Sequence, residues 1–283
     1  MNKYILMIII FLFFSFSLTR NDRIVTIGGS ITEIVFALGA GKSVVAVDWS
    51  SNIPSKVKEL PQVGYVRQLS SEGILSMSPT QILTTTDIGP PKVIDQIKDI
   101  GVDIRIFESP KSFNDIILLI TDISKLLDKE KEAKKIISNL NSLNIEIKKN
   151  QSLFKEKPKI VFFMSPTANS YNAAGGETKA DYLIEYIGGV NIFSDTFNRY
   201  SKITKEDIIN SNPDIILVGF IQMLNPDELD LVSLFIDNSI FKHVEAVKNK
   251  KVIAIDMGKY LNFGPSFVSD ALSLTNQINV EKK

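Results

Sequence analysis

One segment near the middle of the chain constrains the fold more than any other. Residues 129–153 contain neither glycine nor proline and are rich in lysine, glutamate, isoleucine and leucine. As a helix with a rise of ~1.5 Å per residue, this segment would be about 35 Å long, which is the width of a domain. Because it lies between two halves that each alternate strand and helix patterns, we predict that it is a strut joining two lobes.

The first half of the chain alternates apolar strand patterns with helix patterns. Residues 23–27 and 44–48 are predicted strands, and residues 30–33 between them have the Ser-x-x-Glu form of a capping box that opens a helix. The order strand, helix, strand implies a parallel sheet. Further strands are predicted at residues 81–85 and 102–107.

The second half has the same character and begins with a strand pattern at residues 159–163. The apolar runs at 215–218 and 252–255 are typical of a sheet buried on both faces. We therefore predict the α/β fold class, with two Rossmann-like lobes of mainly parallel sheets, one long joining helix and a ligand cleft between the lobes. The predicted divisions are 22–127 for the N-terminal lobe, 128–154 for the connecting helix and 155–283 for the C-terminal lobe.

An internal repeat relates the two halves. Residues 69–79 align without gaps with residues 203–213. In each copy a hydroxyl residue precedes a glutamate by two positions, a short helix follows, and a proline leads into a strand. This alignment places Glu72 and Glu206 at equivalent positions of two similar lobes. A carboxylate in the first turn of a helix also stabilises the helix end, which is the alternative role for both residues.

The N-terminus has the features of a secretory signal. Lys3 supplies a positive charge, residues 5–16 form an apolar and hydroxyl run, and residues 15–17 form a small-x-small cleavage site. The run is shorter than the about 20 residues of a membrane span. We predict a signal peptide at residues 1–17, with an uncleaved anchor as the alternative. The chain has no cysteine, which excludes disulfides, thiolate catalysis and a lipid-modified N-terminal cysteine.

Charge and motif content exclude several function classes. Lysine plus arginine equals aspartate plus glutamate at 32 each, so no overall field favours nucleic acid or an anionic membrane surface. The turn at residues 28–30 does not continue as a dinucleotide-binding motif. With one histidine, no cysteine, no G-x-S-x-G and no zinc motif, we expect no enzyme activity and no catalytic residues. An enzyme that uses paired carboxylates in the interlobe cleft is the remaining catalytic alternative.

The stretch at residues 64–73 carries the most specific chemistry. Tyr65 and Arg67 are two residues apart, so in an extended segment their side chains point the same way. A phenol has a pKa of about 10 in water, and a neighbouring guanidinium or a hard cation favours its anion. Phenolate suits ferric iron, and tyrosine occurs as an axial ligand of haem iron. An ordinary half-buried loop aromatic is the alternative interpretation.

Four stretches carry a family resemblance: GGSITEIVFALGAG at residues 28–41, VGYVRQLSSEGILSMSPTQIL at 63–83, GPP at 89–91 and YLNFGPSF at 260–267. Together they resemble the haem (hemin) periplasmic substrate-binding proteins of ABC importers. The first stretch is shared more loosely with cobalamin- and siderophore-binding relatives. The resemblance implies two α/β lobes bridged by a long helix, a periplasmic location and a role in haem and iron uptake.

The resemblance also implies the ligand site. Tyr65 would be the axial ligand of ferric haem b, the transported ligand, and Arg67 would contact either the phenolate or a propionate. Tyr171, Tyr260 and Phe263 belong to loops that follow strand ends, where open α/β sheets present their ligand loops. These rings would suit a porphyrin face, with core packing as their alternative role.

The second axial ligand of the iron stays open at this point. Some members of the family add a histidine from the second lobe, but the only histidine here is His243, for which we expect a structural or surface role. Five-coordinate iron bound through Tyr65 is one outcome. Met164, Tyr171 or Tyr260 approaching the other face is the second.

The same resemblance implies the partners. Glu72 and Glu206 would dock the two lobes onto arginines of a membrane permease, which works with its ATPase. An outer-membrane haem receptor would act upstream, no nucleic acid is expected, and the chain would act as a monomer. Cobalamin or an iron–siderophore bound on the same fold is the alternative, although cobalamin does not need a tyrosinate and a siderophore pocket favours several cations.

Overall fold

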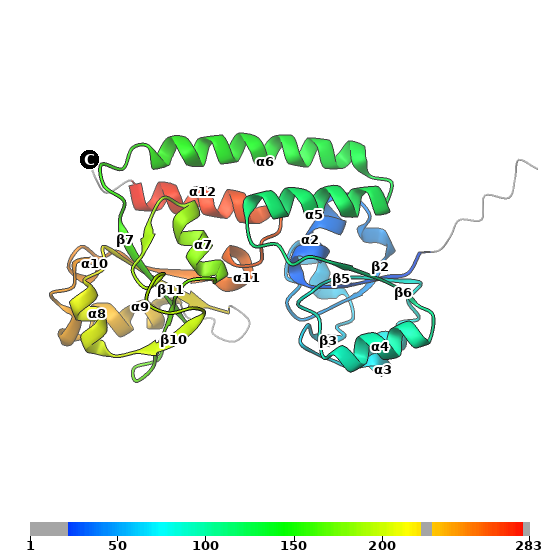
Figure 1. Ribbon diagram of the computed structural model, residues 1–283, viewed down its shortest axis with the longest axis horizontal. Helices are drawn as coiled ribbons and strands as arrows, with labels where there is room; N and C mark the ends of the chain where they lie inside the picture. Colours follow the sequence, from blue (N-terminus) through cyan, green and yellow to red (C-terminus); the bar gives the residue numbers. More distant parts are fainter. Residues whose placement is uncertain (1–21, 222–227, 280–283) are drawn as a thin grey trace, which may run out of the picture.

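The computed structural model describes residues 22–221 and 228–279 as two lobes beneath one long helix (Figure 1). The predicted signal peptide at residues 1–17 lies outside these described residues. Among the described helices, none combines the length and the apolar character that crossing a membrane requires.

The first lobe is built on a four-stranded parallel sheet with the strand order β2-β1-β5-β6. The central strands β1 and β5 are buried almost throughout, whereas the edge strand β6 is partly exposed. The strands are β1 Ile24–Ile27, β2 Val44–Val47, β5 Gln81–Thr85 and β6 Asp103–Phe107. The other elements are α2 Gly29–Ala37, η1 Gly41–Ser43, η2 Ser55–Glu59, the hairpin β3 Gly64–Tyr65 and β4 Gln68–Leu69, α3 Ser71–Leu75 and α4 Pro91–Asp99.

The second lobe has a mixed sheet with the order β10-β8-β7-β11-β12, and β9 pairs with β7. Strands β7, β11 and β12 are parallel, whereas β8 and β10 run antiparallel to their neighbours. All six residues of β11 are buried, as expected for a central strand covered on both faces. The strands are β7 Lys159–Met164, β8 Tyr171–Ala174, β9 Val190–Asn191, β10 Tyr200–Ile203, β11 Ile215–Phe220 and β12 Val252–Asp256; the helices are α7 Lys179–Tyr186, α8 Lys205–Ser211, α9 Glu228–Ile236, η3 Ser239–Phe241, α10 Glu245–Lys248 and α11 Met257–Tyr260.

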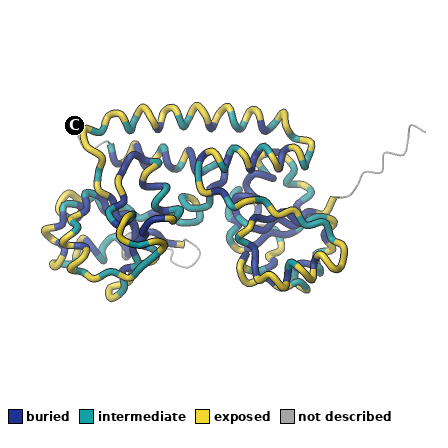
Figure 2. Tube along the Cα trace, in the orientation of Figure 1, coloured by how far each residue is buried: buried dark blue, intermediate teal, exposed yellow. Residues whose placement is uncertain are grey.

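A layer of three helices joins the lobes. The helix α6, Glu130–Gln151, spans both lobes and packs on α5, Phe113–Leu126, and on α12, Ser266–Asn279 (Figure 1). Its buried residues Ala133, Leu140 and Ile147 recur every seven positions, which places them on one face of the helix. The rest of α6 is largely polar and faces solvent (Figure 2). The predicted two-lobed α/β fold with one long joining helix is therefore confirmed.

The two lobes share one hydrophobic core. A single cluster of buried residues includes Ile34 and Phe113 from the first lobe, Leu140 from α6, and Phe162 and Leu183 from the second lobe. Protein interiors are close-packed, so lobes that share a core cannot move freely past each other. The lobes are thus held by packing along the helix layer, and each also has its own smaller core on the far side of its sheet.

The prediction of a capping box at residues 30–33 is wrong. Helix α2 begins two residues earlier than this box requires, with Gly28 in place of Ser30 as its N-cap and no side-chain capping bond. The Glu33 carboxylate instead accepts hydrogen bonds from the Ser266 backbone N–H, at 2.5 Å, and from the Asn262 side-chain amide, at 3.1 Å. Both donors lie in the second lobe, so the glutamate that looked like a helix cap joins the two lobes.

The internal repeat is confirmed by the geometry of two short helices. The Ser70 hydroxyl accepts a hydrogen bond from the Gly73 N–H at the start of α3, and the Thr204 hydroxyl accepts one from the Asp207 N–H at the start of α8. The repeated pattern therefore specifies the same element at equivalent places in the two lobes.

Candidate functional site

The loops that follow the parallel strands bring the two lobes face to face. Gly29, just after β1, lies so close to Asn262 that an added Cβ would be 2.2 Å from the asparagine oxygen. Asn262 follows β12 by way of α11. Ligands of open α/β sheets bind outside the carboxyl ends of the strands. We use the name interlobe face for a surface with two sides. The first-lobe side is formed by the loops after β1, β2 and β5, and the other side by the second-lobe residues that face these loops.

Tyr65 lies on a hairpin that is fixed to this face. The hairpin pairs Gly64 with Leu69 and Tyr65 with Gln68. Its backbone is tied to the loop after β2 by a 2.9 Å hydrogen bond from the Trp49 N–H to the Gly64 carbonyl. The Gly89 N–H, after β5, donates to the Val66 carbonyl, also at 2.9 Å. Tyr65 is 41% exposed, although Val66 beside it is buried, so the hairpin presents the phenol on a rigid support.

Arg67 is also exposed and forms a weak ion pair. Its Nη2 lies 3.9 Å from Oδ1 of Asp87, with side-chain exposures of 66% and 40%. Asp87 also accepts a 2.6 Å hydrogen bond from the Ser109 hydroxyl. An exposed pair at this distance contributes at most about 1 kcal/mol. The guanidinium can therefore exchange this partner for an incoming anion at low cost.

Lys179 faces the same residues from the second lobe. It is the first residue of α7, and its ammonium lies 5.1 Å from the centre of the Phe263 ring. Burial lowers the pKa of Lys179, the Asp87 carboxylate partly opposes this shift, and Arg67 lowers the pKa further. The two charged neighbours that act on this lysine thus belong to the first lobe. Lys179 and Arg67 are thus cations of different lobes that are close enough to influence each other.

Sequence reasoning did not identify Lys179 or Asp87 as site residues. A lysine in the first turn of a helix and an aspartate before a glycine–proline turn are ordinary surface patterns. Trp49 was missed in the same way, although its indole is 51% exposed beside the Tyr65 hairpin. Only the packing of the loops shows that these residues share one face, because they come from three separate parts of the chain.

The predicted second-lobe aromatic residues have different positions. Tyr171 is 3% exposed and packs among Phe163, Phe235 and Phe241 in the core of its lobe. Phe263 is fully buried and stacks on Phe267 in the core that the lobes share. Tyr260 and Met164 are partly buried next to that core. In this structure the rings of Tyr171 and Phe263 do not reach the molecular surface.

His243 lies away from the interlobe face. It is exposed in the turn between η3 and α10. Two residues further on, Glu245 donates its N–H to the Asn212 side chain, and Ala246 donates its N–H to the Pro213 carbonyl. Asn212 and Pro213 lie just before the start of β11. The histidine is therefore on the side of the amino ends of the strands, opposite the edge that carries the candidate site.

Glu72 and Glu206 are exposed on different lobes. Each is the second residue of its short helix, α3 or α8. Both helices lie on the parts of their lobes away from α6 (Figure 1). Neither glutamate provides the capping hydrogen bond of its own helix, which Ser70 and Thr204 supply. The two carboxylates are thus available to a partner that contacts both lobes.

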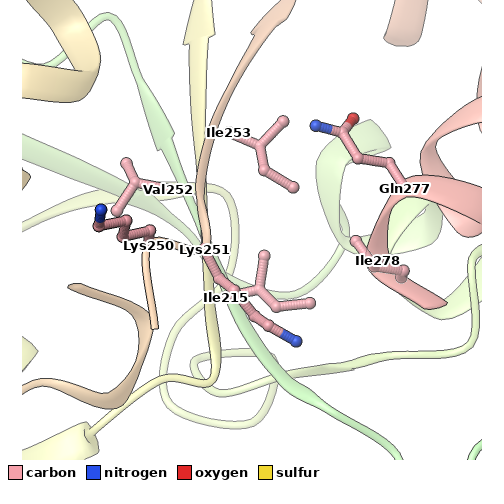
Figure 3. A pocket seen from close by; sticks show the side chains of 7 residues that line it. All are labelled: Ile215, Lys250, Lys251, Val252, Ile253, Gln277 and Ile278. Carbon is pink, nitrogen blue, oxygen red and sulfur yellow. The ribbon is translucent and has the colours of Figure 1, made fainter. Parts of the chain in front are cut away.

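A small hollow lies elsewhere in the second lobe. It is found at the amino ends of β11 and β12 and has a volume of about 80 Å³. Figure 3 shows its lining of Ile215, Lys250, Lys251, Val252, Ile253, Gln277 and Ile278. Sites for drug-sized ligands typically have volumes of about 300–1,000 Å³. This hollow is too small for such a ligand and lies at the edge opposite Tyr65.

Comparison with known proteins identifies a family over most of the chain. A family model described as periplasmic binding protein matches residues 24–257. Among solved structures, the chain is similar to the periplasmic heme-binding protein RhuT from Roseiflexus sp. RS-1, with 29% identity, a TM-score of 0.81, and coverage of 90% of this chain and 97% of that one. It is also similar to the periplasmic heme-binding protein HutB of Vibrio cholerae, with 28% identity, a TM-score of 0.79, and coverage of 91% and 99%.

The curated relatives have a different described ligand. The chain is 25% identical over 221 residues to a vitamin B12-binding protein of Yersinia pestis (strain Pestoides F), with coverage of 76% of this chain and 74% of the relative. The similar solved structures are therefore described as binding heme, and the similar curated sequence as binding vitamin B12.

Proposed function

The chain belongs to the periplasmic binding protein family, and we propose that it captures haem between its two lobes and delivers it to the permease of an ABC importer. The observation that carries the proposal is the exposed phenol of Tyr65 beside Arg67 on a fixed hairpin at the interlobe face. The similarity to two periplasmic heme-binding proteins supports it.

Tyr65 would bind the iron of ferric haem b. A phenolate is a hard oxygen donor, and tyrosine is an established axial ligand of haem iron. The charge of ferric iron favours the phenolate over the phenol, and the guanidinium of Arg67 adds to this effect. Because the hairpin is tied to the loops after β2 and β5, Tyr65 would need little rearrangement to bind.

Arg67 and Lys179 would bind the two propionates of haem. Arg67 has only a weak exposed ion pair with Asp87, and Lys179 lies half-buried against the Phe263 ring. A carboxylate placed between them would form charge-assisted hydrogen bonds, which are stronger than neutral ones. Contacts to cations on both lobes would also draw the lobes together around the ligand. Tyr171 and Phe263 are core residues in this structure, and Tyr260 is the remaining second-lobe aromatic for the ligand.

The exposed glutamates Glu72 and Glu206 would dock the two lobes onto the permease. The two glutamates occupy equivalent positions in two similar lobes. They therefore suit a partner with one cationic site for each lobe, and arginine side chains bind carboxylates well. The chain would act as a monomer, with an ATPase driving the permease and a haem receptor of the outer membrane supplying the ligand.

Cobalamin is the second candidate ligand, because the matched curated relative is a vitamin B12-binding protein. We favour haem because cobalamin does not need a tyrosinate for binding. Equilibrium dialysis with cyanocobalamin tests this alternative directly. Saturable cobalamin binding without a hemin spectrum would replace haem with cobalamin as the ligand.

A hemin titration of the chain from residue 18 onward tests the proposal. We expect a saturable Soret change with ferric-phenolate charge-transfer bands. In Tyr65→Phe, which removes only the hydroxyl, we expect the charge-transfer bands to be lost and hemin to bind at least about a hundredfold more weakly, which corresponds to about 2.7 kcal/mol. An unchanged spectrum and affinity in the variant would show that Tyr65 is not the iron ligand. No saturable binding by the original chain would overturn the proposed function.

A further inference from the structure

Trp49 is the only tryptophan in the chain, and it occupies an unusual position. It lies two residues beyond the end of β2, on the interlobe face, and its side chain is 51% exposed. Single exposed apolar residues are common on protein surfaces and need no explanation by themselves. The groups around this indole point to a role in ligand binding.

The backbone at Trp49 is held on both sides. Asp48 is fully buried, and its carboxylate accepts hydrogen bonds from the Gly28 N–H, the Ser50 N–H and the hydroxyls of Ser50 and Ser51, at 2.5–3.0 Å. The Trp49 N–H itself donates to the Gly64 carbonyl at 2.9 Å. The chain therefore places this residue with little freedom, although its side chain is not used to fill the core.

The backbone of Trp49 is bonded to the hairpin that carries the phenol of the candidate ligand site. Gly64, which accepts the Trp49 hydrogen bond, is the residue directly before Tyr65, and both aromatic side chains are exposed. Within the described part of the chain, the Trp49 ring stacks on no other aromatic ring. An exposed, unstacked indole on a fixed backbone, bonded to the hairpin of an exposed phenol, offers a flat apolar surface near an oxygen donor.

We propose that Trp49 is a ligand-binding residue that packs its indole against the macrocycle of a metal–tetrapyrrole held by Tyr65. The proposal rests on the proposed function and adds a specificity residue to it. A planar, largely apolar ring system is the ligand chemistry that an indole recognises, because aromatic pairs gain energy from offset or edge contacts in addition to buried area. A siderophore of oxygen donors without a large ring would gain much less from this contact.

Fluorine NMR can detect the contact without relying on affinity. With 5-fluorotryptophan incorporated, the chain has a single ¹⁹F resonance, because Trp49 is the only tryptophan. Gallium(III) protoporphyrin IX is the probe, since it is diamagnetic and its metal accepts oxygen ligands. The ring current of a macrocycle in contact with the indole should shift this resonance, in parallel with the Soret change of the probe.

Each outcome of this experiment decides a different claim. A saturating Soret change with an unmoved ¹⁹F resonance would overturn the role of Trp49 and leave the proposed function standing. The absence of any Soret change, in both the gallium and the hemin titrations, would overturn the proposed function and this inference with it. A shift that saturates together with the Soret change supports the contact.

Variants test whether the contact contributes to binding. We expect Trp49→Ala to weaken hemin binding about tenfold and Trp49→Phe, which keeps a flat ring, to stay within about threefold of the original chain. Ile145→Ala on α6 is the matched control, because Ile145 is also an exposed apolar residue, 68% exposed, and lies away from the interlobe face. Equal affinity of Trp49→Ala and the control, with unchanged melting temperatures, would contradict the proposal.

Discussion

At the scale of a single residue, Lys179 holds its positive charge in an unfavourable position. It is a cation at the positive end of a helix, partly buried, and next to Arg67. A positive charge at a helix N-terminus is unfavourable, and burial lowers the pKa of its ammonium. An anionic ligand would offset both effects, as is common for perturbed groups at functional sites.

Lys179→Met should therefore weaken hemin binding about tenfold, which corresponds to the loss of one charge-assisted contact of about 1.4 kcal/mol. Binding of hemin dimethyl ester, whose propionates are blocked, should change little. Parallel Soret titrations measure both affinities. Lys205→Met is the matched control, since Lys205 also begins a helix after a threonine cap but lies in α8. An equal loss of affinity for both ligands would contradict a carboxylate role.

At the scale of elements, the contact between α2 and the start of α12 holds the lobes together. Glu33 is 5% exposed and accepts hydrogen bonds from Ser266 and Asn262. Burial raises the pKa of Glu33 to about 7, although these hydrogen bonds oppose the shift, and the charge of Asp270 raises it further. In the unfolded chain a glutamate has a pKa of about 4.3. The folded state therefore binds the proton more tightly.

Protonated Glu33 should stabilise the folded state. This stabilisation should be fully present below about pH 4.3 and lost as the pH rises through about 7. The unfolding free energy should fall between pH 5 and pH 8 by up to about 3 kcal/mol from this group. Denaturant unfolding at both pH values measures the change. Glu33→Gln should reduce this pH response, whereas Glu146→Gln, which removes an exposed carboxylate on α6, should keep it. A response unchanged in Glu33→Gln would rule out Glu33 as its source.

At the scale of the whole molecule, two similar lobes joined through one core carry the two carboxylates that we propose for docking. Because the lobes share packed residues along α5, α6 and α12, Glu72 and Glu206 keep a nearly constant spacing. A partner with two cationic sites at this spacing would contact both carboxylates at once.

Reversing both charges, Glu72→Arg with Glu206→Arg, should abolish haem transport by vesicles that contain the permease and its ATPase. The introduced arginines would be repelled by the cationic sites of the permease. Hemin affinity should stay unchanged, as Soret titration can show. The control reverses two other exposed glutamates, Glu146→Arg with Glu156→Arg, and should keep transport. Loss of hemin binding in the first variant would mean that these residues do not serve docking alone.

The family resemblance and the fold were predictable from the sequence. The matched family model and the similar haem-binding structures confirm the resemblance that four sequence stretches indicated. The helix at 130–151, the parallel strands and the two capped helices α3 and α8 also follow from local patterns. Periodicity, helix caps and apolar runs involve residues that are neighbours in the chain, so one sequence is enough to recognise them.

Tertiary structure alone decided which of the chemically suitable residues share a face. Tyr171 and Phe263 match a porphyrin as well as Trp49 does by residue type, yet packing buries the first two and leaves Trp49 exposed. Glu33 fits a capping box locally, yet its partners are 229 and 233 residues away. Burial and contacts between the lobes depend on how distant segments pack together. The sequence by itself therefore determined the elements and their family, and the packing of the two lobes decided which residues share the candidate site.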